Sequence, residues 1–169
     1  LSMGEFDDAA FAADQFEQAI GGASPLSLQV RGRSLLLEGK PKEARNEFEG
    51  ALMMSPDALA PRLGLVDVYT QLRDYEEALF HVNEALKVHD DQPDVHGRKA
   101  YILEKLERFE EAEAAYRKAI ELQPRHVNSL NNLAYLLAEK RKNKAEALKL
   151  ARKAYALSPG NPAIMDTLG

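Results

Sequence analysis

The stretch that decides the fold is RFEEAEAAYRKAIELQP, which occupies residues 108–124. Its apolar residues recur with the i, i+3, i+4, i+7, i+8 spacing of an amphipathic helix, at Ala112, Ala115, Tyr116, Ala119 and Ile120. Pro124 ends the segment because proline cannot continue a helix. The stretch therefore predicts one helix with a single apolar face, and that face needs a packing partner.

The same pattern recurs along the chain at a spacing of 34 residues. Two columns of alanine share this spacing: Ala44, Ala78 and Ala112, and then Ala51, Ala85 and Ala119. Residues 26–38, 59–72, 94–106 and 127–140 form a second set of predicted helices, and short polar turns such as Gly39-Lys40 join the two sets. A period of this length indicates a tandem array of helical hairpins.

Two segments carry a resemblance to a known family. Arg73-Asp74-Tyr75-Glu76-Glu77-Ala78-Leu79 resembles the turn and second-helix start of the tetratricopeptide repeat (TPR), and residues 116–124 resemble its end. The resemblance covers about residues 25–169 and is to TPR arrays of bacterial type. It implies an all-α, right-handed α-solenoid of antiparallel helix hairpins, a TPR-like superhelix.

The phase of the repeat predicts the boundaries of the units. Residues 25–58, 59–92, 93–126 and 127–161 are expected to be four TPR units, residues 1–24 a partial N-terminal helix of a preceding repeat, and residues 162–169 the start of a truncated fifth unit. Ala147 lies 35 residues after Ala112, so the fourth unit carries a one-residue insertion. The first helix of the fourth unit keeps the 34-residue spacing, so the insertion is expected in the turn at residues 140–144. We also expect the natural chain to continue beyond Gly169.

The composition excludes several classes of function. Cysteine is absent, which removes disulfides, thiolate metal sites and cysteine nucleophiles. The net charge of −5 disfavours nucleic acid as a partner, and no apolar run approaches the roughly 20 residues of a membrane span. Glycine loops for phosphate, His-Glu-x-x-His and EF-hand sequences are not found. We therefore expect no enzyme, no cofactor, no metal and no membrane insertion. Localisation stays open between cytoplasm and periplasm.

One polar segment offers an alternative to this interpretation. His89 and His96 flank Asp90, Asp91 and Asp94, and such a set of side chains is able to bind a metal ion. The simpler expectation is a polar turn between two repeats.

The resemblance also implies a binding surface. In TPR proteins the first helix of each unit lines a concave groove in which peptides bind. Carried over by phase, the groove positions are Arg33, Asp67, Arg98, Tyr101, Lys105, Asn128, Asn131, Asn132 and Tyr135. Tyr101 and Tyr135 share one column in adjacent units, so their rings are expected to supply contact area while amides pair a peptide backbone. The alternative is a merely solvated polar face.

Two functions follow from these expectations. The first is a scaffold or adaptor that binds a peptide or protein segment in the concave groove. The alternative is a structural self-assembly module that acts through repeat ends or the convex face, because an open stack propagates by end-to-end contact.

Overall fold

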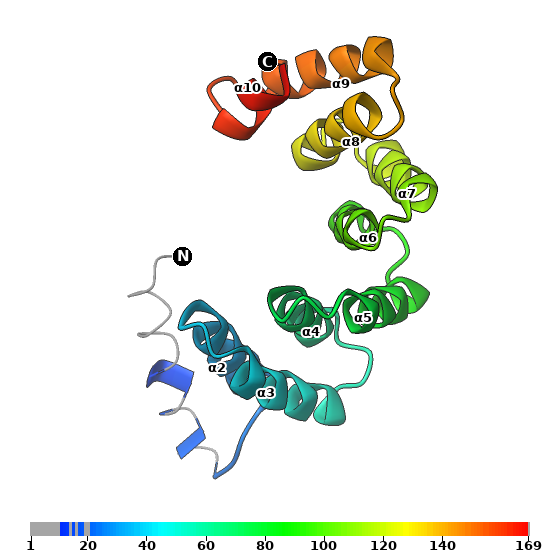
Figure 1. Cartoon of the computed structure of the whole chain (residues 1–169). Coiled ribbons are helices and arrows are strands. Elements are labelled where there is room, and N and C mark those ends of the chain that lie inside the picture. Colours follow the sequence, from blue (N-terminus) through cyan, green and yellow to red (C-terminus); the bar gives the residue numbers. More distant parts are fainter. Residues whose placement is uncertain (1–10, 14, 16, 19–20, 169) are drawn as a thin grey trace. The chain divides into compact units, whose positions relative to one another are not determined.

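The computed structural model describes residues 11–13, 15, 17–18 and 21–168, with side chains as far as residue 165. The described residues contain no strand; residues 11–13, 15 and 17–18 are helical, and nine helices with defined bounds follow them (Figure 1). Their bounds are α2 Pro25–Leu37, α3 Pro41–Met54, α4 Leu59–Gln71, α5 Tyr75–Val88, α6 Pro93–Lys105, α7 Phe109–Leu122, α8 Val127–Glu139, α9 Lys144–Leu157 and α10 Pro162–Leu168. The predicted all-α fold is confirmed.

The helices form two compact units, Leu1–Val88 and His89–Gly169. In the first unit the hairpins α2–α3 and α4–α5 pack through α3 against α4, and α2 also touches α4. In the second unit the hairpins α6–α7 and α8–α9 pack through α7 against α8, and α6 also touches α8. Within each unit, then, the first helices of successive hairpins are neighbours.

Three of the hairpin turns share one backbone conformation. Gly39, Arg73 and Glu107 have φ values of 74°, 60° and 59°, which lie in the left-handed region. In each turn the following amide donates to a carbonyl five residues back, for example from Lys40 N to Leu35 O at 2.8 Å. This is the Schellman geometry that ends helices and starts a tight return.

Close approach of the helices in the first unit depends on small residues. Ala44 and Ala78 are fully buried, and the ring of Phe48 is buried against Gly32 and Gly64. A Cβ atom added at Gly64 would lie 2.4 Å from the Phe48 ring, so only glycine fits there without rearrangement. The helix backbones of α2 and α4 therefore both lie directly against this ring.

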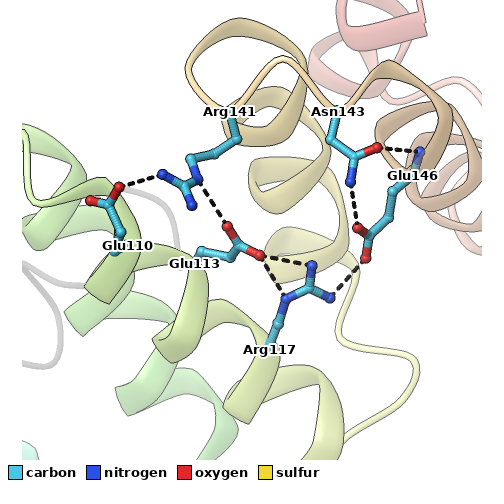
Figure 2. A network of polar contacts seen from close by, with 6 residues as sticks. All are labelled: Glu110, Glu113, Arg117, Arg141, Asn143 and Glu146. Carbon is cyan, nitrogen blue, oxygen red and sulfur yellow. Dashed lines mark hydrogen bonds and ion pairs between the residues drawn. The ribbon is translucent and has the colours of Figure 1, made fainter.

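The α8–α9 turn is one residue longer than the turns of the other hairpins. It holds four residues, 140–143, whereas three residues separate the helices of each of the others. Arg141, within the longer turn, binds Glu110 and Glu113 of α7 (Figure 2). Arg117 of α7 in turn donates to Glu113 Oε1 and Glu146 Oε1, both at 2.8 Å. The network ties α7 to the longer turn and to α9.

The ends of the chain are described in part. Of the predicted N-terminal helix, Ala12 is helical, while Phe16, Ala19 and Ile20 lie outside the described residues. At the other end α10 packs on α8 and α9, and its Ile164 is buried with Leu130 and Ala154.

Candidate functional site

Seven of the nine predicted site residues lie on two neighbouring helices, α6 and α8. Arg98, Tyr101 and Lys105 recur along α6 at the three- and four-residue spacing that places side chains on one side of a helix. Asn128, Asn132 and Tyr135 recur in the same way along α8. We call these six residues the α6–α8 face.

Both tyrosines of the α6–α8 face are exposed. The accessible fraction is 39% for Tyr101 and 49% for Tyr135, which confirms the predicted exposure. The Nζ atom of Lys105 lies 4.9 Å from the centroid of the Tyr101 ring, within the range of a cation–π contact. The structure therefore already places one cation on an aromatic ring of this face.

The remaining predicted residues have different surroundings. Arg33 is exposed on α2 and Asp67 is partly buried on α4, so both belong to the first unit. Asn131 is on α8, but its Oδ1 atom is buried and has no hydrogen-bond partner among the described residues. We leave Asn131 out of the α6–α8 face for this reason.

A chain of three polar side chains runs beside the face. Tyr116 of α7 is fully buried, and its hydroxyl donates to Glu104 Oε2 of α6 at 3.1 Å. The Asn132 side chain of α8 lies beside Tyr116 and acts to lower the pKa of its hydroxyl. A phenol has a single proton, which here goes to Glu104, so the group that Asn132 can offer to the phenol oxygen is an amide N–H. The three side chains thus follow one another from Asn132 through Tyr116 to Glu104.

Burial sets the protonation of this chain. Burial raises the pKa of Tyr116 strongly, and the neighbouring Glu104 carboxylate raises it further. The hydroxyl therefore remains a donor at neutral pH. Burial also raises the pKa of Glu104, while the hydrogen bond from Tyr116 and the charges of Lys105 and Lys140 act in the opposite direction. Glu104 is thus a carboxyl group whose ionised form has lost part of its hydration.

The sequence analysis missed this chain, although the repeat contains a signal for it. Tyr116 lies two periods, 68 residues, after Phe48, and Asn132 lies 68 residues after Gly64. In the first unit the Phe48 ring packs on Gly64, and in the second unit Tyr116 meets Asn132 at the equivalent contact. A hydroxyl in one column and an amide in the facing column therefore indicated a polar contact at this position.

A second polar cluster lies at the start of α8. His126 Nδ1 accepts from the backbone N–H of Ser129 at 3.3 Å and lies 2.7 Å from the Ser129 hydroxyl. Because Nδ1 is an acceptor, the proton is on Nε2, which donates to Asp94 Oδ1 at 2.8 Å. Ser129 is buried. The contacts of these three residues cap α8 and link its start to α6.

The segment considered as a metal site is held by local contacts. His96 Nε2 lies 2.8 Å from the backbone oxygen of Asp90, and Asp94 binds His126. In the described part of the chain, no three side chains of metal-binding type gather at one point. Among the helices that the structure describes, none is both long enough and apolar enough to cross a bilayer.

Comparisons with known proteins agree with the repeat. Two models of the tetratricopeptide repeat match the chain, one at residues 35–102 and the other at residues 98–162. A TPR repeat-containing protein of Pseudomonas aeruginosa is 29% identical over 167 residues, which is 98% of this chain. The chain spans 28% of the length of that relative.

Solved structures show the same fold. A thermophilic TPR protein of Thermus thermophilus superposes with a TM-score of 0.80 at 20% identity, over 98% of this chain and 89% of that one. MamA of Desulfovibrio magneticus gives a TM-score of 0.78 at 16% identity, over 94% and 89% of the two chains. The likeness shows the α-solenoid fold. The chain belongs to the tetratricopeptide repeat family of protein-interaction scaffolds.

Proposed function

We propose that this chain binds an extended segment of a partner protein on the α6–α8 face. The observation that carries the proposal is the pair Tyr101 and Tyr135, which are exposed at equivalent positions of two contacting helices. Exposed tyrosines provide large, rigid contact area at low cost in conformational entropy, and such residues dominate binding energy at interfaces.

The polar residues of the face suit a peptide backbone. Asn128 is exposed and Asn132 partly exposed on α8, and each amide group has both a donor and an acceptor. An extended peptide presents N–H and C=O groups in alternation, so amides of this kind pair it without regard to its side chains. Arg33 on α2 and Asp67 on α4 belong to the first unit, and their role in partner binding stays a separate prediction.

Site-specific photo-crosslinking in cells of the source organism tests the proposal. A benzophenone side chain replaces Tyr101 in one variant and Tyr135 in another. The matched control is Tyr155 on α9, whose accessible fraction of 42% is similar but which lies outside the face. We expect the same partner to be crosslinked from both face positions and not from Tyr155. Crosslinking from Tyr155 alone, or to unrelated proteins from the two face positions, contradicts the proposal.

Self-assembly is a second candidate, favoured by exposed apolar side chains on second helices of the first unit. Met53 on α3 is 85% exposed, and Met54 on α3 and Phe80 on α5 are also exposed. Exposed apolar residues of this kind serve contacts between proteins when they gather into a patch. Sedimentation over a wide concentration range separates the candidates: the adaptor stays a monomer, whereas a self-assembly module grows with concentration and Met53→Ser reduces that growth.

A further inference from the structure

We propose that the α6–α8 face selects a partner segment with a basic side chain, lysine or arginine, for which Glu104 is the counter-ion. This inference rests on the proposed function, because it specifies which ligand chemistry that same face takes.

The hydrogen-bond directions beside the face favour a donor in the ligand. Tyr116 uses its only proton on Glu104 Oε2. This bond leaves Glu104 Oε1, which is an acceptor, whereas the neighbouring Asn132 amide offers both an acceptor and a donor. Glu104 and Asn132 are only partly buried. A ligand that pairs with the Glu104 carboxylate must therefore bring donors; an ammonium group brings three of them and a guanidinium group five.

The aromatic residues of the face favour a cation as well. The face of a tyrosine ring is electronegative and attracts ammonium and guanidinium groups. Lys105 demonstrates this, because its Nζ atom lies 4.9 Å from the Tyr101 centroid. Lys105 is exposed, so a basic side chain of the ligand is able to compete with it for the ring.

The electrostatics of Glu104 point in the same direction. Burial raises the pKa of this carboxyl group, so its ionised form lacks part of the stabilisation that water gives. The charged groups that act on it are Lys105 on α6 and Lys140 after α8, both exposed, and its hydrogen-bond partner is Tyr116 of α7. Exposed lysines are screened by solvent. A ligand cation in direct contact supplies the stronger, less screened partner.

Peptide selection tests the inference. A random peptide library displayed on phage is selected on the wild-type chain, on Glu104→Gln and on the double variant Tyr101→Ala/Tyr135→Ala. Glutamine keeps an oxygen that accepts from the Tyr116 hydroxyl and removes only the charge, so Glu104→Gln should fold normally. We expect wild-type selection to enrich lysine or arginine at one fixed position of the peptides, and Glu104→Gln to lose that preference.

Affinities of a selected lysine peptide and its acetyl-lysine counterpart give a test that does not depend on the variant's folding. Acetylation removes the charge. We expect acetylation to weaken binding to the wild type about tenfold or more, since hydrogen bonds to charged groups contribute that much. Lys105→Met, which removes the competing cation, should tighten the lysine peptide about two- to fivefold. Weaker binding of the lysine peptide to Lys105→Met would mean that Lys105 assists binding instead of competing with the ligand's cation, and this result overturns the inference.

The outcomes for the inference and for the proposed function are distinct. If selected peptides require Tyr101 and Tyr135 but show no basic position, the face binds peptides and the inference about Glu104 is wrong. If the wild type enriches no more than the double tyrosine variant does, the proposed function itself fails, and the inference fails with it.

Discussion

The substitution Gly64→Ala tests the close approach of helices in the first unit. The added methyl group would lie 2.4, 2.5 and 2.6 Å from three atoms of the Phe48 ring, whereas carbon atoms in contact are about 3.5–4.0 Å apart. Gly32 on α2 restricts the same ring, because a Cβ there would lie 2.8 Å from it. The ring therefore has little room to move, and we expect overpacking to destabilise the chain by about 1–3 kcal/mol.

The matched control is Gly50→Ala, which makes the same chemical change inside a helix. A Cβ at Gly50 would approach no atom nearer than 3.4 Å, at the Leu28 side chain. Alanine is favoured over glycine within a helix by about 0.5–1 kcal/mol, so Gly50→Ala should stabilise. Urea unfolding followed by far-UV circular dichroism measures both variants, which should shift in opposite directions.

A second substitution identifies Phe48 as the cause. Phe48→Leu removes part of the ring and should cost less stability in the Gly64→Ala background than in the wild type, because the two changes share one contact. The reasoning is refuted if Gly64→Ala stabilises as much as Gly50→Ala does, or if Phe48→Leu costs the same in both backgrounds.

Three further predictions concern the turns, Glu104 and the ion network. Glu107 has a positive φ of 59°, a conformation that glycine adopts freely, so Glu107→Gly should stabilise the chain by about 0.5–1 kcal/mol. Gly39 occupies the equivalent turn, so Gly39→Ala should destabilise the chain. Thermal melts measure the direction of both changes in stability. Burial raises the pKa of Glu104 above its ordinary value, so the folded chain holds this proton more tightly than the unfolded chain does. The wild type should therefore lose stability relative to Glu104→Gln as pH rises from about 4 to 7. A constant difference between the two unfolding free energies contradicts this. Arg141→Gln removes the ion pairs with Glu110 and Glu113 of α7. The loss should lower the unfolding free energy by about 0.2–1 kcal/mol at low salt and by less in about 1 M salt. Chemical unfolding at the two salt concentrations measures the change.

The fold was predictable because the repeat carries it redundantly. The apolar columns recur in every unit, and several helix boundaries are also marked by a proline such as Pro124 or by a turn such as the one at Glu107. The longer α8–α9 turn was also predictable, since Ala147 keeps the phase of its own helix and departs from the 34-residue period. Independent columns with a common phase leave few alternative folds.

The candidate site was less predictable because its contacts join three helices. The exposure of Tyr101 and Tyr135 was expected from the TPR resemblance, carried over by the phase of the repeat. The buried chain through Tyr116 did not, because a tyrosine in an apolar column is compatible with either an apolar or a hydrogen-bonded environment. Glu104 precedes Tyr116 by 12 residues and Asn132 follows it by 16, and the packing of three helices brings them together. Whether the face binds a partner stays a prediction.

The most direct test of the central claim is the affinity of a wild-type-selected peptide for the double variant Tyr101→Ala/Tyr135→Ala. Both side chains are exposed, so unfolding free energy should change by less than about 0.5 kcal/mol. Because interface tyrosines are frequent hot spots, each worth roughly 1 kcal/mol or more, we predict at least about tenfold weaker binding by isothermal titration calorimetry. Unchanged affinity in a stably folded double variant would contradict the assignment of the α6–α8 face as the binding surface.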